Sequence, residues 1–109
     1  VGLAQLDLPP LSLNLTSGSV RLKGEEILLN RKEFQLLVYL MENRGQELSQ
    51  EQIYRAVWES PPEAMGNAVK MTISRLRQKL RLEETGCFEL STTPNQGYMF
   101  LQTGYPASS

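Results

Sequence analysis

The sequence predicts an α+β fold in which a small antiparallel sheet is followed by three helices and a closing β-hairpin. Three observations support this prediction. Apolar and polar residues alternate in short runs near the start of the chain, apolar residues recur at helical spacing through its middle, and a turn containing Asn95 and Gly97 separates two further strand-like runs near its end. The 109 residues fit a single domain.

The domain itself is predicted over residues 11–101. Residues 1–10 end in Pro9 and Pro10, which favour extended backbone, so we expect a linker or loosely held arm. Residues 102–109 are expected to form a frayed tail. The chain lacks an initiator methionine and a signal peptide, and no apolar run approaches the roughly 20 residues of a membrane span. We therefore expect a cytoplasmic fragment of a longer protein, without a membrane segment of its own.

Three short runs predict an antiparallel meander before the first helix. Residues 11–15 alternate strictly between apolar and polar, which is typical of a half-buried strand. Residues 20–22 alternate again after a turn, and a second turn precedes residues 27–29. We expect these three runs to pair as neighbouring strands.

Two helices are predicted from their capping signals. Asn30 is followed three residues later by Glu33, as in a capping box, and apolar residues at helical spacing come next. Ser49 and Gln52 have the same spacing and precede a shorter apolar pattern that ends near Trp58. Consecutive prolines then interrupt the chain, so we expect the second helix to stop before them.

A third helix is predicted over about residues 65–82, starting between Glu63 and Asn67. Residues placed about 100° apart around such a helix fall on separate faces. The apolar stripe comprises Val69, Ile73, Leu76 and Leu80. The opposite face holds Asn67, Met71, Ser74, Arg75 and Gln78. The flanks hold Lys70, Arg77 and Arg81 on one side, and Thr72 and Lys79 on the other.

Charge is distributed unevenly along the chain. The net charge is −1, and a pI of about 5.5 is unusual for a nucleic-acid binder. Residues 64–82, however, contain five of the eleven cations and no acidic residue, which leaves six cations and all twelve acids elsewhere. A local field of one sign survives overall neutrality over about a Debye length, roughly 8–10 Å. The third helix can therefore attract an anion although the chain is acidic.

This arrangement suits the major groove of duplex DNA. Short polar side chains and bidentate arginine read base edges, while flanking lysine and arginine meet phosphates. A helix that merely keeps itself soluble usually mixes glutamate with lysine, and this one has no acidic residue before Glu83. The alternatives are a solvated helix face or a basic helix that meets an acidic protein partner.

The chain closes with a predicted hairpin of residues 88–101. Strands, three helices and a hairpin in this order make a winged helix-turn-helix. Asn95, Gln96 and Tyr98 are candidates for contacts with sugar and phosphate, with Asn95 or Gln96 entering the minor groove. An ordinary turn chosen for its backbone geometry explains Asn95 and Gly97 equally well.

Catalysis and metal binding find no support in the sequence. There is no histidine, Cys87 is the lone cysteine, and neither a paired-carboxylate motif nor a phosphate-binding glycine loop is present. We therefore expect no enzyme activity, no metal site and no cofactor.

The motifs point to a known family by resemblance. They occur in order at residues 33–37, 48–49, 56–58, 67–69, 73–80 and 97–100, and the last two read Ile-Ser-Arg-Leu-Arg-Gln-Lys-Leu and Gly-Tyr-Met-Phe. With them the chain resembles, over residues 11–101, the C-terminal effector domain of OmpR/PhoB-type response regulators. The resemblance implies a domain that binds duplex DNA and regulates transcription within a two-component phosphorelay. The helix at about residues 65–82 would lie in the major groove and the wing, residues 88–101, at the minor groove.

The same resemblance implies contacts residue by residue. The expected base contacts are Asn67, Met71 and Arg75. The expected contacts with the DNA backbone are Trp58, Ala68, Lys70, Thr72, Ser74, Arg77, Lys79, Gln96 and Tyr98. Trp58 would use its backbone amide, and we expect its indole to pack in the core. The loop expected to meet RNA polymerase includes Glu59, Pro61, Pro62 and Glu63.

The partners implied by the resemblance are duplex DNA with direct-repeat sites, a second copy of the chain on that DNA, RNA polymerase, and a phosphorylatable receiver domain upstream. A different upstream sensor domain is the alternative. The sequence departs from many family members at three positions, since Asn67 and Pro94 stand where arginine is common and Lys70 where an acid is common. Loss of the wing arginine weakens the case for minor-groove insertion, and we expect Lys70 to compensate in part as a phosphate contact.

Overall fold

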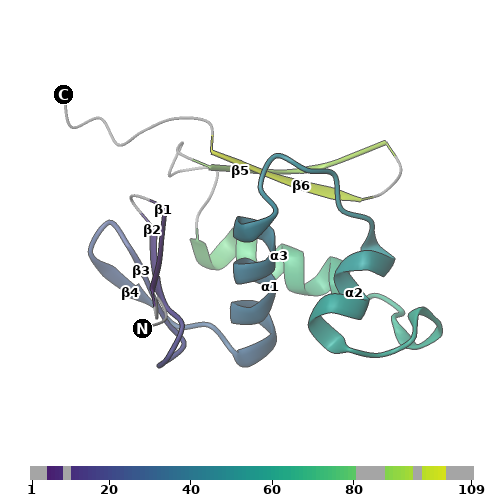
Figure 1. Ribbon diagram of the computed structural model, residues 1–109, viewed down its shortest axis with the longest axis horizontal. Helices are drawn as coiled ribbons and strands as arrows, with labels where there is room; N and C mark the ends of the chain where they lie inside the picture. Colours follow the sequence, from purple (N-terminus) through teal and green to yellow (C-terminus); the bar gives the residue numbers. More distant parts are fainter. Residues whose placement is uncertain (1–4, 9–10, 81–87, 95–96, 103–109) are drawn as a thin grey trace.

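The structure is a computed structural model that describes residues 5–8, 11–80, 88–94 and 97–102. In chain order its elements are β1 (Gln5–Leu8), β2 (Leu11–Asn14), β3 (Ser19–Leu22), β4 (Glu25–Ile27), α1 (Arg31–Glu42), α2 (Gln50–Trp58), the 3₁₀ turn η1 (Pro62–Ala64), α3 (Ala68–Leu80), β5 (Phe88–Thr92) and β6 (Tyr98–Gln102). The N-terminal sheet lies beside the helices, and the β5–β6 hairpin crosses one end of them (Figure 1). The predicted α+β class and winged-helix order are confirmed. Among the described residues, no helix is long and apolar enough to cross a membrane.

The N-terminal strands form one antiparallel sheet in the order β1-β2-β3-β4. Leu13 pairs with Val20, which in turn pairs with Ile27. Because alternate residues of a strand share a face, this register places Leu11, Leu13 and Val20 on the same side of the sheet, and all three are buried. The predicted meander is therefore present and closes one side of the core.

Strand β1 replaces part of the arm expected for residues 1–10. Gln5–Leu8 pairs with β2, from Gln5 opposite Asn14 to Leu8 opposite Leu11, and Leu6 packs against the core. The four residues Gln5–Leu8 are too few for their apolar pattern to predict a strand, and their strand depends on pairing with β2. The rest of the expected arm, residues 1–4 and 9–10, and residues 103–109 of the expected tail lie outside the described residues. Gln102 ends β6 and so does not belong to a tail.

Strand β4 begins and ends two residues earlier than predicted. The turn before it consists of Lys23 and Gly24 alone, both with positive φ (53° and 85°), so the chain reverses within two residues. As a result Leu28 lies beyond the strand and is 80% exposed.

Helices α1 and α2 begin as their capping signals predict. The Asn30 side chain accepts from the Glu33 N–H (2.8 Å), and the Glu33 carboxylate accepts from the Asn30 N–H (3.0 Å), which closes the capping box. The Ser49 hydroxyl accepts from the Gln52 N–H at 3.0 Å. Helix α2 ends at Trp58, as predicted.

Helix α3 begins at Ala68, three residues later than the start at about residue 65 expected from the sequence. Pro62–Ala64 form the separate turn η1, and Gly66 adopts a φ of 52°, which a right-handed helix excludes. The N–H of Met71 bonds to the Asn67 carbonyl (2.9 Å), so Asn67 stands at the cap rather than inside the helix. The expected last turn, residues 81–82, lies outside the described residues.

The three helices and the hairpin share one core. Helix α1 contributes Leu36, Leu37 and Leu40 at 0% exposure, which makes it the central helix of the domain. Each of the other helices buries its own apolar stripe against it. From the hairpin, Phe88 and Phe100 stack with their ring centroids 5.5 Å apart.

Backbone bonds attach the hairpin to the loop between α1 and α2. Leu48 and Tyr98 exchange N–H···O bonds of 2.8 and 2.7 Å, and the Gly45 N–H donates to the Phe100 carbonyl at 2.8 Å. A Cβ at Gly97 would lie 2.5 Å from the Leu48 carbonyl oxygen, so this close approach requires glycine. The base of the wing is thus held by main-chain contacts.

Candidate nucleic-acid interface

Helix α3 divides into two faces as the sequence predicts. Val69, Ile73, Leu76 and Leu80 are each at most 1% exposed. The opposite face is in solvent and holds the exposed residues Asn67, Met71, Ser74, Arg75 and Gln78. Met71 is 51% exposed, which is unusual for a large apolar side chain and places it where a partner can contact it. Lys70, on the edge of this face, is exposed as well.

A groove of about 420 Å³ borders this face near the start of the helix. Its walls are the beginning of α1 (residues 30–32), Trp58 at the end of α2, and Ala68, Met71, Thr72 and Arg75 of α3. Met71 and Arg75, two of the three expected base contacts, therefore line both the groove and the exposed face. Arg31 and Lys32, which the sequence analysis did not single out, line the groove from α1.

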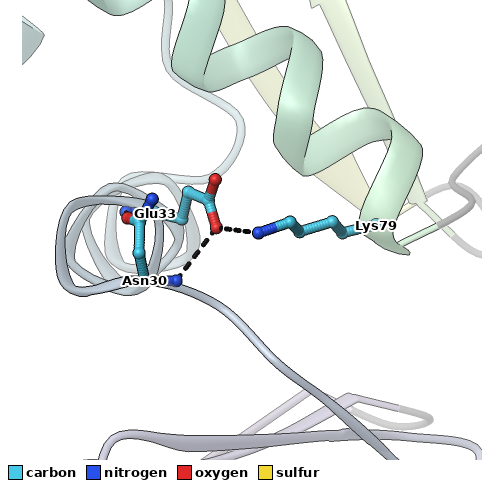
Figure 2. A network of polar contacts seen from close by, with 3 residues as sticks. All are labelled: Asn30, Glu33 and Lys79. Carbon is cyan, nitrogen blue, oxygen red and sulfur yellow. Dashed lines mark hydrogen bonds and ion pairs between the residues drawn. The ribbon is translucent and has the colours of Figure 1, made fainter.

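Lys79, expected to contact phosphate, forms an ion pair inside the domain. Its ammonium lies 2.6 Å from the Glu33 carboxylate oxygen that also accepts the Asn30 N–H (Figure 2). The Glu33 side chain is 1% exposed and that of Lys79 is 39% exposed. The other oxygen of Glu33 is buried and has no hydrogen-bond partner among the described residues. Lys79 thus neutralises a buried charge, and a phosphate contact would compete with that pairing.

The pKa of Glu33 lies below its ordinary value of 4.5. Burial alone would raise it, because burial disfavours the charged form. The hydrogen bonds from Lys79 and Asn30 and the positive charges of Lys79 and Arg75 outweigh this effect. Glu33 is therefore a carboxylate at neutral pH.

Arg77, also expected to contact phosphate, bonds to the hairpin. Its Nε and Nη2 both donate to the Leu90 carbonyl oxygen, at 3.2 and 2.5 Å. The guanidinium is half-buried and ties α3 to β5. Thr72 is 5% exposed, and its hydroxyl donates to the Ala68 carbonyl one turn earlier at 2.8 Å. Both side chains are therefore engaged within the domain.

Of the two wing residues expected at the DNA backbone, the structure describes Tyr98 only. Tyr98 is 5% exposed, and its ring belongs to the core. Burial raises the pKa of its hydroxyl above the ordinary 10.0, although the charge of Arg77 acts in the opposite direction. Asn95 and Gln96, the two candidates for entering the minor groove, lie outside the described residues. Pro94 is exposed before the turn.

Trp58 is half-buried at the end of α2, and its indole packs as expected. The ring stacks on Tyr54, with centroids 5.3 Å apart, and the Lys32 ammonium lies 5.9 Å from its centroid. The same ammonium donates to the Val57 carbonyl at 3.0 Å. Lys32 thereby fixes the end of α2 against the beginning of α1.

The loop after α2 is largely exposed to solvent. Glu59 ends the helix with a φ of 55°, and its N–H bonds to the Arg55 carbonyl at 3.1 Å. Pro61 and Glu63 are exposed with Glu59, whereas Pro62 is half-buried in η1. This loop is accessible to a protein partner.

The chain is similar to known DNA-binding regulators. Residues 24–100 match the family model described as "Transcriptional regulatory protein, C terminal". The response regulator RppA of Synechocystis sp. is 34% identical over 84 residues, which are 77% of this chain and 36% of RppA. The chain thus spans little more than a third of that relative's length.

Solved structures share the fold. The DNA-binding domain of CpxR from E. coli matches with a TM-score of 0.79 at 28% identity, over 92% of this chain and 98% of that one. The Klebsiella pneumoniae RstA DNA-binding domain, solved in complex with the RstA box, matches with a TM-score of 0.78 at 27% identity. That match covers 89% of this chain and 96% of the RstA chain.

We predict that Lys79→Met lowers the free energy of unfolding by about 1–3 kcal/mol, because it leaves the buried Glu33 carboxylate without its cation. The exposure of Lys79 keeps the loss below that of a fully buried pair. Lys70→Met, on the exposed side of the same helix, should change stability by less than about 0.5 kcal/mol. Urea unfolding of both variants without DNA measures this, and equal losses would contradict the structural role of Lys79.

The lowered pKa of Glu33 also predicts a pH dependence. The folded chain stabilises the carboxylate, so this contribution is fully present above pH 4.5 and is lost as the pH falls through the lower folded value. The difference in unfolding free energy between the wild type and Glu33→Gln should therefore shrink from about pH 7 to about pH 3. Glu25→Gln, at an exposed position of β4, serves as the control. A difference for Glu33→Gln that stays constant with pH would refute the prediction.

Proposed function

The chain belongs to the family of transcriptional regulatory protein C-terminal domains, the effector domains of OmpR/PhoB-type response regulators, and from this premise we propose that it regulates transcription by sequence-specific binding of duplex DNA. Helix α3 is the proposed reading element, with its exposed face in the major groove. The relative solved in complex with the RstA box supports this proposal at the level of the family.

The observation that carries the proposal is the division of α3 itself. One face is held in the core by four apolar side chains, so the helix is a rigid element and its other face is presented to solvent. That exposed face carries short polar groups, Met71 and Arg75, and the described helix contains no acidic residue. Side chains of this kind can contact base edges, and arginine can bond guanine with two donors.

Within this proposal, Asn67, Met71 and Arg75 contact bases. Lys70 and Ser74, both exposed, and the beginning of α3 at Ala68 contact the backbone, and the amide of Trp58 meets a phosphate. Gln96 stays a proposed contact of the wing. The side chains of Thr72, Arg77, Lys79 and Tyr98 are engaged within the domain, so we propose that they support binding chiefly by holding α3 and the wing in place.

The remaining partners are also proposals. We propose that two copies bind direct repeats, that an upstream receiver domain of a two-component system controls them by phosphorylation, and that the cytoplasm is the place of action. The accessible loop with Glu59, Pro61, Pro62 and Glu63 is the proposed contact with RNA polymerase. The domain itself is proposed to have no enzymatic activity.

Selection of bound sites from random duplexes tests the function. We expect a recurring sequence, and we expect affinity for it to fall steeply with salt, because each neutralised phosphate releases counterions. The logarithm of the binding constant should decrease linearly with the logarithm of the salt concentration. A flat salt response would contradict DNA binding and leave a protein-interaction module as the alternative.

Arg75→Ala should relax base preference. We expect a loss of about 1–3 kcal/mol on the selected site if the guanidinium reads a guanine, and a much smaller loss on unrelated duplexes. Arg21→Ala removes an exposed arginine from β3 and should leave both affinities unchanged. Equal losses of Arg75→Ala on selected and unrelated duplexes would show that Arg75 contacts phosphate instead of a base.

A further inference from the structure

The groove between α1 and α3 is lined by three cations. Arg31 and Lys32 face it from the beginning of α1, and Arg75 faces it from α3. Among the described residues that line it there is no carboxylate. The chain as a whole carries more acids than cations, so this concentration of positive charge is local.

Lys32 is held in place at the groove. Its ammonium donates to the Val57 carbonyl at 3.0 Å and lies 5.9 Å from the Trp58 ring centroid. An ammonium has three donors, so the bond to Val57 leaves two for another acceptor. A cation fixed in this way loses less side-chain entropy when it binds an anion than a free lysine would.

The surroundings of the groove favour an anion. Arg31 is exposed in the first turn of α1, where the helix dipole adds positive potential. Glu33, the acid of this turn, is buried, and its charge is paired with that of Lys79 (Figure 2). The Glu33 charge therefore does little to oppose an anion at Arg31.

We propose that this groove binds a backbone phosphate of the same duplex whose bases face α3, with Arg31 and Lys32 as the contacting cations. The proposal rests on the proposed function. Met71 and Arg75 line both the groove and the exposed face of α3, so a duplex seated on that face reaches the groove. A helix of about 10–12 Å diameter fills a major groove about 12 Å wide, and the phosphates of the bordering strands then lie along its edges.

Two cations of α3 already bind groups within the domain, which makes the phosphate contact of Arg31 and Lys32 more important. Arg77 is bonded to Leu90 and Lys79 to Glu33, so these two cations of α3 are engaged inside the domain. Arg31 and Lys32 supply positive charge on the side of α3 where the helix begins. The DNA backbone is favoured over an acidic protein segment because the groove is continuous with the face proposed to read bases.

The test compares Arg31→Gln with Arg44→Gln, which removes an arginine from the residues just beyond the other end of the same helix. Arg31→Gln should unfold at the wild-type temperature without DNA, since the position is exposed. Arg44→Gln also loses the bond from its guanidinium to the Met41 carbonyl (3.0 Å) and should unfold at a slightly lower temperature, so binding of both variants is measured well below unfolding. For Arg31→Gln we expect the slope of log K against log salt to be smaller by about one, with equal loss on selected and unrelated duplexes. Arg44→Gln should keep the wild-type slope.

A methylphosphonate scan of the selected duplex then locates the phosphate. At one position, loss of the phosphate charge should weaken binding of the wild type more than binding of Arg31→Gln, because only Lys32 still contacts that phosphate in the variant. The proposed phosphate site would be wrong if Arg31→Gln had the wild-type slope of log K against log salt. It would also be wrong if the effects of Arg31→Gln and of the methylphosphonate were additive at every scanned position. Neither result would contradict DNA binding itself. Failure of the wild type to bind duplex DNA would overturn the proposed function instead. If Arg31→Gln keeps full duplex affinity but loses affinity for a polyglutamate peptide, the groove is a protein site and the proposal fails.

Discussion

The Glu33 carboxylate is the interaction on which the position of α3 depends. One of its oxygens accepts both the N–H of Asn30, which closes the cap of α1, and the ammonium of Lys79, in the last turn of α3 (Figure 2). A carboxylate that is 1% exposed requires a partner, because burial of an unpaired charge is strongly unfavourable. The beginning of α1 must therefore lie within reach of the Lys79 side chain. This contact, together with the apolar stripe of α3, determines which face of α3 remains in solvent.

The cations of the domain consequently have two different tasks. Lys79 and Arg77 bind to groups of the chain itself, a buried carboxylate and a main-chain carbonyl of the hairpin. Lys70, Arg75 and Arg31 are exposed and remain accessible to an external anion. A cation of the first kind stabilises the fold and orients the reading helix, so its loss would reduce DNA binding indirectly. Residue type and helical position alone do not separate the two kinds.

The sequence predicted most of what depends on local chemistry. The capping box of Asn30 and Glu33 and the two faces of α3 follow from spacings within a few residues, and the structure has them as predicted. Contacts between distant segments could not be predicted in this way. Glu33 and Lys79 are 46 residues apart, and β1 forms only because β2 pairs with it. The position of Arg31 and Lys32 cannot be predicted from local spacing for the same reason, since they face a groove that α1, α3 and the end of α2 form together.

The wing is held by main-chain contacts and contributes no positive charge from its described residues. Main-chain bonds from Leu48 and Gly45 hold its base, and the close approach of Gly97 to Leu48 requires that no side chain intervene. The described part of the wing, residues 88–94 and 97–102, contains no lysine or arginine. Under the proposed function, most of the attraction for phosphate must then come from α1 and α3. Near the beginning of α3, three cations line the groove: Arg31, Lys32 and Arg75. We expect the strongest attraction for phosphate there. Under the same proposal, a duplex bound by this domain would be held there chiefly by charge.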